Sequence, residues 1–145
     1  MSFDEDDDEY DHFVDAQDSV WDAVLRELDE GRKRSHWMWF VFPVLEGVGE
    51  SGTALFYALR DVEEAEGYLA HPVLGPRLID CCRRVLDHPR SSAREIFGST
   101  DAWKLHNCAT LFRHAAEDPE PFESILRVFF DGRDADRTVD LLGPM

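Results

Sequence analysis

The side chains best suited to chemistry gather around one aromatic segment, residues 33–43, which reads Lys-Arg-Ser-His-Trp-Met-Trp-Phe-Val-Phe-Pro. Fully burying a large aromatic side chain is worth roughly 1.5–3 kcal/mol, so these rings must anchor a core or a concave site. Trp N–H groups and imidazoles need polar partners when they are buried. The segment therefore indicates where a core or a concave site lies, since it combines two Trp, two Phe and a His beside a basic triplet. It does not identify a reaction.

Lys33 and Lys104 are the only two lysines in the chain; the other basic residues are arginines. A lysine ammonium is a flexible point contact for phosphate or carboxylate. His36, beside the aromatic rings, is a candidate for hydrogen bonding or proton transfer. Gln17 falls inside an apolar helical stripe, where it must bond either to local backbone or to a ligand or the His36 region. The candidate ligand-binding residues are Gln17, Lys33, Ser35, His36, Trp37, Trp39, Asp101 and Lys104.

Several classes of site lack their sequence signature. There is no His-Glu-x-x-His or Cys-x-x-Cys spacing, so we expect no metal site and no resident cofactor. Cys81, Cys82 and Cys108 form no disulfide framework and are expected to be reduced core residues. Cys108 and His106 are two residues apart on a helix and would point away from one another, which argues against covalent catalysis. The glycine-spaced loop 46–52 lacks the phosphate-loop pattern and carries two Glu.

The sequence resembles the family known as domain of unknown function 1810. The aromatic segment is the most specific part of the match, and Val44 and Asn107–Ala109 depart from the usual family residues. The matching residues are Ser35–Pro43, Leu45, Gly47, Gly49, Ser51, Phe13–Gln17, Gly31–Lys33, Tyr68–Leu78, Ile96–Gly98, Asp101, Lys104–Leu105 and Thr110–Phe112. The resemblance implies a small, mainly helical single domain and brings no assigned activity.

A second, weaker resemblance links the chain to the NAD- and ADP-ribose-associated glycosidases, through Ala70–Leu78, Phe13–Gln17 and Phe97–Gly98. It implies a nucleotide-like or ADP-ribose-type ligand, which the protein would bind or hydrolyse. Trp37 or Trp39 would stack on a base while Lys33 or Lys104 contacts a phosphate. The acid that carries catalysis in that family has no clear counterpart, so enzyme activity stays open. The alternative is a non-enzymatic interaction or structural domain whose aromatics are only core.

The net charge limits the classes of molecule that the protein can bind. With 31 acidic residues against 15 Lys and Arg, the formal net charge is −16, which repels nucleic acid and anionic lipid. Near molar salt the Debye length falls to about 3 Å and removes most of this self-repulsion. We therefore expect a halophilic protein, a monomer or weak dimer, that binds neither nucleic acid nor membrane; a mesophilic protein with an acidic surface is the alternative. The longest apolar run, residues 37–42, is too short to cross a bilayer and the N-terminus is acidic, so we expect a cytoplasmic protein.

The segments that position the candidate site residues have the sequence patterns of helices. Residues 1–10 contain six acids and predict a disordered acidic leader, followed by a single helical domain over residues 11–145. Apolar residues from Phe13 to Leu28 keep a helical period, and Gly31 is placed to cap that helix. The aromatic segment itself fits either a buried strand or a helical turn. We expect an all-α fold, a compact array of about six to eight short helices.

Overall fold

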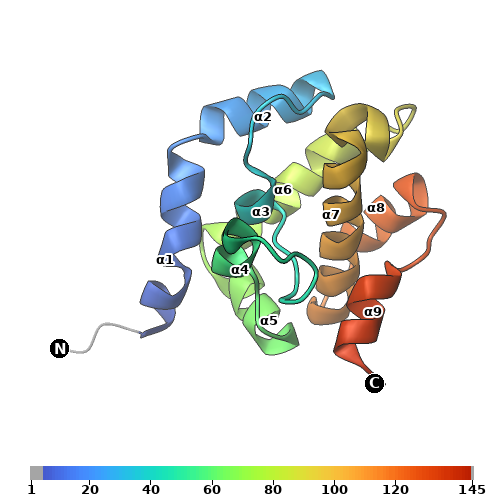
Figure 1. Cartoon of the computed structure of the whole chain (residues 1–145). Coiled ribbons are helices and arrows are strands. Elements are labelled where there is room, and N and C mark those ends of the chain that lie inside the picture. Colours follow the sequence, from blue (N-terminus) through green and yellow to red (C-terminus); the bar gives the residue numbers. More distant parts are fainter. Residues whose placement is uncertain (1–4, 145) are drawn as a thin grey trace.

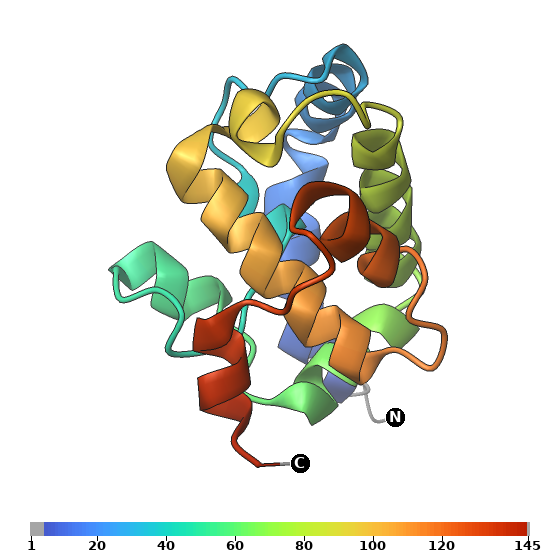
Figure 2. The same cartoon turned by 90° about the vertical axis from the view of Figure 1, so that its right-hand side faces the viewer.

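The computed structural model describes residues 5–144 of the chain, and these residues fold mainly into helices, as Figures 1 and 2 show. The helices form where apolar residues recur at helical spacing. The only β pairing among the described residues is a single parallel bridge between Leu45 and Leu59. The helices are α1 Glu5–Asp18, α2 Trp21–Glu30, α3 Met38–Val41, α4 Gly52–Tyr57, α5 Val62–Ala70, α6 Leu74–Leu86, α7 Ala93–Ala115, α8 Phe122–Phe129 and α9 Asp136–Leu142. The predicted all-α class is confirmed.

The central element is α7, which packs against α3, α5, α8 and α9. In Figure 1 it runs between α1–α5 on one side and α8 and α9 on the other, while α6 also packs against α8. Phe112 of α7 is fully buried and stacks on Phe122 of α8 at 5.5 Å between ring centroids. Most of the aromatic side chains lie in the core or pack against it, where burying one ring fully contributes roughly 1.5–3 kcal/mol.

One close approach fixes how α5 meets α6. A Cβ added at Gly75 would lie only 2.0 Å from the backbone carbonyl oxygen of Leu69, so no other residue fits without moving one helix. The α5–α6 corner therefore depends on a glycine in the first turn of α6.

The structure contains nine helices within the described residues, whereas six to eight were predicted. The helix predicted over Phe13 to Leu28 is two helices, because Val20 adopts a non-helical backbone and the chain turns between α1 and α2. The Ser19 hydroxyl donates to the Ala16 carbonyl at this break. Hydrophobic periodicity misses such a turn, since both helices place apolar residues on one continuous stripe.

The described residues begin inside the segment predicted as an acidic leader, residues 1–10. Residues 1–4 lie outside the described residues, α1 begins at Glu5, and Tyr10 is buried. Tyr10 donates a hydrogen bond of 2.8 Å to the Glu64 carbonyl of α5. Helix α1 therefore includes residues 5–10 of that segment.

The aromatic segment forms a helical turn rather than a strand: α3 covers Met38–Val41, and Pro43 follows it. Two helix caps that local sequence patterns specify are present. Gly31 ends α2 in the left-handed conformation, and Ser92 with Glu95 forms a capping box at the start of α7. No helix in the part of the chain that the structure describes is long and apolar enough to cross a membrane.

Candidate functional site

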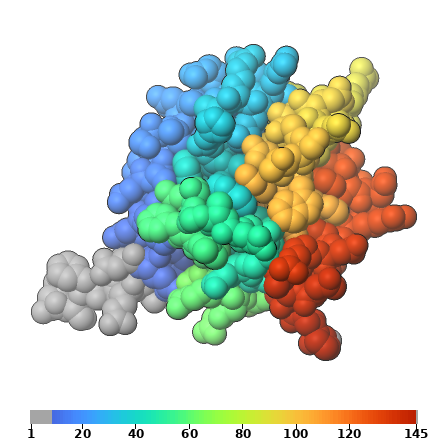
Figure 3. All heavy atoms as spheres, in the orientation of Figure 1, coloured from blue at the N-terminus to red at the C-terminus, as the bar shows by residue number. Residues whose placement is uncertain are grey.

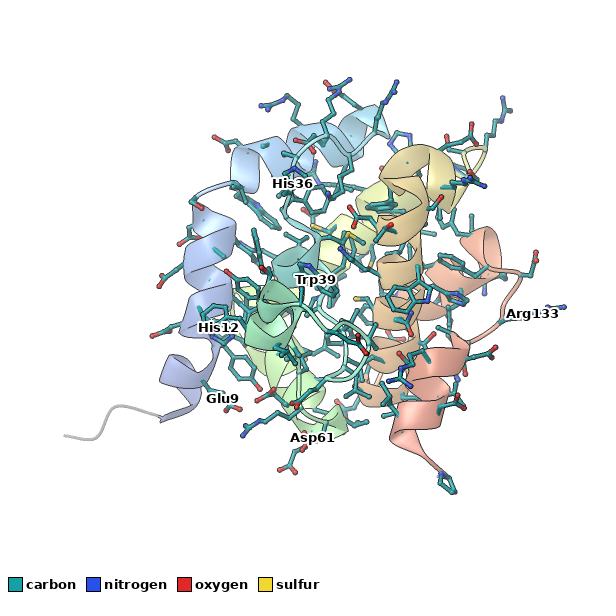
Figure 4. The ribbon with its side chains drawn as sticks, viewed as in Figure 1. Glu9, His12, His36, Trp39, Asp61 and Arg133 are labelled. Carbon is teal, nitrogen blue, oxygen red and sulfur yellow. The ribbon has the colours of Figure 1, made fainter. Side chains whose placement is uncertain are left out.

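A pocket of about 290 Å³ lies between the aromatic segment, the start of α4 and the middle of α7. The buried side chains of Trp37 and Met38 form a wall of the pocket, whereas His36, Ser51 and Thr53 are exposed at its rim. In Figure 3 the cyan-to-green segment 33–57 adjoins the gold part of α7 on the near face, and Figure 4 labels His36 and Trp39. The lining residues are Lys33, His36, Trp37, Met38, Trp39, Phe40, Ser51, Thr53, Asp101 and Lys104.

Both lysines of the chain converge on one carboxylate in this pocket. Lys33 Nζ lies 2.8 Å from Asp101 Oδ2, and Lys104 Nζ lies 3.0 Å from Asp101 Oδ1. The Lys33 and Lys104 side chains are only 6% and 12% exposed, and that of Asp101 is 18% exposed. Two positive charges thus face one negative charge in a shielded place, which leaves the cluster with a net charge of +1.

The two indole rings of the pocket face the two ammonium groups. Lys104 Nζ lies 4.0 Å from the centroid of the Trp39 ring, and Lys33 Nζ lies 5.0 Å from that of Trp37. Both distances are within the range of cation–π attraction, which stabilises a cation by about 0.5–2 kcal/mol. The rings and Asp101 together hold the lysines in place.

The charge state of Asp101 follows from its neighbours. Burial raises the pKa of this carboxyl, but the hydrogen bonds and charges of Lys33 and Lys104 outweigh burial and lower its pKa below the ordinary value. Asp101 is therefore ionised at neutral pH and serves as the counter-ion of both lysines.

A kink in α7 places the cluster. Gly98 has φ +81° and ψ 164°, a conformation that favours glycine, and it separates the first turns of α7 from the part that carries Asp101 and Lys104. The Ile96 carbonyl just before the kink accepts a hydrogen bond of 2.8 Å from the backbone N–H of Lys33. Asp101 and Lys104 are three residues apart on the helix and so share one face. The kink thus joins the aromatic segment to α7 where the lysines meet.

Sequence reasoning missed Glu27, a buried carboxylate of α2 that supports the aromatic segment. Its oxygens accept hydrogen bonds from the Ser35 N–H at 2.9 Å, the Ser35 hydroxyl at 2.5 Å, the Arg34 N–H at 2.6 Å and the Trp37 indole N–H at 3.1 Å. Although burial raises its pKa, these hydrogen bonds lower the pKa of Glu27 to about 2. The sequence does contain a sign of this role: Glu27 falls three residues after Val24, so a charged residue occupies a position on the apolar face of α2.

Two of the predicted residues are bonded outside the pocket. The Gln17 amide donates to the Phe40 carbonyl at 2.7 Å and to the Tyr68 hydroxyl at 3.1 Å, and its oxygen accepts from Arg77 at 3.2 Å. Ser35 is bonded to Glu27 and is absent from the pocket lining. The other six candidates, Lys33, His36, Trp37, Trp39, Asp101 and Lys104, all line the pocket.

A larger hollow of about 680 Å³ lies at the start of α5, and its character is acidic. Glu9, Asp61, Glu63 and Glu64 line it, and its Arg60 is paired with Glu9 and Glu64. It offers no excess positive charge to an anionic ligand. Among the described residues, no cluster of three or more His, Cys, Asp or Glu side chains is arranged to hold a metal ion.

Comparison with known proteins places the chain among uncharacterised relatives. A family model described as "Protein of unknown function (DUF1810)" matches residues 7–142. The crystal structure of the conserved hypothetical protein Rv1873 from Mycobacterium tuberculosis is similar, with a TM-score of 0.92 and 43% sequence identity. The match covers 94% of this chain and 98% of that chain. No curated protein matches.

Proposed function

The chain belongs to the DUF1810 family, whose description names no activity, so we propose a function from the chemistry of its own pocket. The protein binds a small nucleotide-like or ADP-ribose-type metabolite, and Lys33 and Lys104 contact its phosphate. The pocket around Asp101 is the binding site.

One observation carries this proposal: the only two lysines of the chain meet on a single carboxylate in a pocket. Burying charged groups is costly, and their mutual attraction offsets that cost only when charges and hydrogen bonds balance. Here two ammonium groups share one carboxylate, so the balance is incomplete. A bound anion would complete it, which is why an unbalanced cluster in a pocket favours a binding role.

The contrast with the rest of the surface supports the same conclusion. A chain with a formal charge of −16 repels anions at long range, yet its described residues place a positive cluster in this hollow. At about 1 M salt the long-range repulsion is screened beyond roughly 3 Å, whereas direct contacts in a shielded pocket persist. We therefore place the protein, as part of this proposal, in a salt-rich cytoplasm, where it acts as a monomer.

The pocket favours binding over hydrolysis. Asp101 is the only carboxylate among the lining residues, and its lowered pKa keeps it without a proton to donate. A general acid needs a pKa near the working pH. His36 at the rim is our candidate for proton transfer, so we expect any hydrolysis to depend on it.

The alternative is a helical domain in which the aromatics are only core and an exposed face binds a protein. Trp37, which is 1% exposed, fits that interpretation. The exposed side chains of Leu55 and Phe56 on α4 would supply an apolar contact. A core role does not account for Lys104 lying over Trp39 beside a second buried ammonium.

A thermal-shift titration tests the proposal. The protein is melted in about 1 M KCl with AMP, NAD or ADP-ribose, because a ligand at about 100 times its dissociation constant adds about 2.7 kcal/mol of stability. The shift should be lost in Lys104→Met, which keeps the stem that packs on Trp39 and removes the charge. Arg90→Gln is the matched control, since Arg90 is exposed and has no hydrogen-bond or ion-pair partner among the described residues. No shift with any ligand, or an equal loss in both variants, contradicts the proposal.

A further inference from the structure

We infer that the pocket recognises the oxyanion of its ligand and leaves any base unrecognised, so that its ligand class is compact phosphomonoesters. This inference rests on the proposed function and narrows it.

The indole rings are already used by the protein. Trp37 is 1% exposed, and its N–H is bonded to Glu27, so it offers no free face to a base. Lys104 covers Trp39 at 4.0 Å from the ring centroid. The far edge of the same ring packs so closely on Gly49 that a Cβ there would lie 2.5 Å from it. A base stacking on Trp39 within the pocket would have to displace the Lys104 ammonium.

The lysines, in contrast, keep donors for an anion. An ammonium group has three N–H bonds. Those of Lys33 are directed to Asp101 and to the Ser35 carbonyl, and Lys104 is directed to Asp101. Among the described residues this leaves one N–H on Lys33 and two on Lys104 without an oxygen or nitrogen acceptor, although both ammonium groups also face the indole rings. Because Asp101 holds both ammonium groups close together, these donors can bind two oxygens of one phosphate group.

The size of the pocket sets an upper limit on the ligand. A volume of about 290 Å³ lies at the lower end of the range of roughly 300–1,000 Å³ that small-molecule sites occupy. It suits a phosphate with its attached sugar, whereas the remainder of a dinucleotide would lie outside. The exposed Ser51 and Thr53 hydroxyls stand at the rim, where sugar hydroxyls of such a ligand would reach.

Calorimetric titration with ribose 5-phosphate, AMP, adenosine and inorganic phosphate tests this inference. We expect AMP and ribose 5-phosphate to bind with dissociation constants within about tenfold of one another, and inorganic phosphate to compete with both. Adenosine, which has the base and sugar without the anion, should bind about 100-fold more weakly than AMP, because it gives the lysine ammonium groups no charged acceptor. Trp39→Phe keeps an aromatic face for Lys104, so it should weaken AMP and ribose 5-phosphate by the same factor.

The outcomes separate this inference from the proposed function. If adenosine binds within about tenfold of AMP, or AMP binds more than about tenfold tighter than ribose 5-phosphate, the base is recognised and the inference is wrong while nucleotide binding stands. Loss of AMP binding alone in Trp39→Phe leads to the same conclusion. If none of the phosphate compounds binds the wild-type protein, the proposed function fails as well.

Discussion

Replacing Glu27 tests whether its buried carboxylate holds the aromatic segment in place. Its pKa is lowered from 4.5 to about 2, which corresponds to about 3 kcal/mol of stability at neutral pH. Since the folded-state pKa is the lower one, this stability is fully present above about pH 4.5 and is lost as the pH falls toward 2. We expect Glu27→Gln to lower the free energy of unfolding by about that amount at neutral pH, because glutamine keeps one acceptor and loses the charge.

The pH dependence makes this prediction specific. For pKa values of 4.5 and about 2, the difference in unfolding free energy between wild type and Glu27→Gln should narrow by about 1.4 kcal/mol between neutral pH and about pH 3.5. Urea unfolding followed by circular dichroism at several pH values measures it. The matched control is Glu30→Gln, on the same helix, because Glu30 is exposed and its ion pair with Arg34 is worth little.

Two results would refute the reasoning. A difference between wild type and Glu27→Gln that stays constant from neutral pH to about pH 3.5 would mean that the carboxylate is not stabilised in the folded state. An equal narrowing in Glu30→Gln would mean that general charge repulsion, and not the four hydrogen bonds, causes the pH dependence.

Three further changes probe other parts of the account. Gly75→Ala should destabilise the protein by about 3 kcal/mol, because its Cβ would meet the Leu69 carbonyl at 2.0 Å. The control Gly52→Ala has open space around the new Cβ and should be neutral or stabilising by about 0.5–1 kcal/mol. Similar melting temperatures for the two variants would contradict the α5–α6 packing. Gln17→Leu leaves the Phe40 carbonyl without its side-chain donor and should lower the free energy of unfolding by about 1–3 kcal/mol, as measured by urea unfolding. An unchanged urea midpoint would contradict this prediction. Dialysis from about 1 M salt into low salt should lower the melting temperature because of the −16 charge, and unchanged melting would count against the halophilic proposal.

The sequence predicted the local elements best where a short motif carries the geometry. The Ser92–Glu95 capping box and the Gly31 cap are present because each depends on only a few neighbouring residues. The pair Asp118–Pro119 has the pattern of a cap followed by a proline at the first helical position, yet α8 begins at Phe122. There the same region holds two prolines, and local pattern alone does not decide which one precedes the helix.

The candidate site shows the limit of reasoning along the chain. Residue type singled out Lys33 and Lys104, but their meeting on Asp101 depends on the Gly98 kink and on the bond from Lys33 to Ile96, which join segments far apart in sequence. Gln17 was interpreted correctly as a buried amide that needs partners, yet the partners come from α3, α5 and α6. Such long-range pairings are set by packing, which no local pattern encodes.

The convergence of the two lysines can be measured directly, because a protein labelled with ¹³C only at lysine has two lysine side chains to observe. In NMR spectra, Asp101→Asn should shift the Cε signals of both Lys33 and Lys104, and titration with AMP should move both with one common dissociation constant. Asp29→Asn, which removes an acid that pairs with Arg84 away from the pocket, should move neither. If Asp101→Asn shifts only one signal, or AMP leaves both unchanged, the anion-binding pocket does not exist as described.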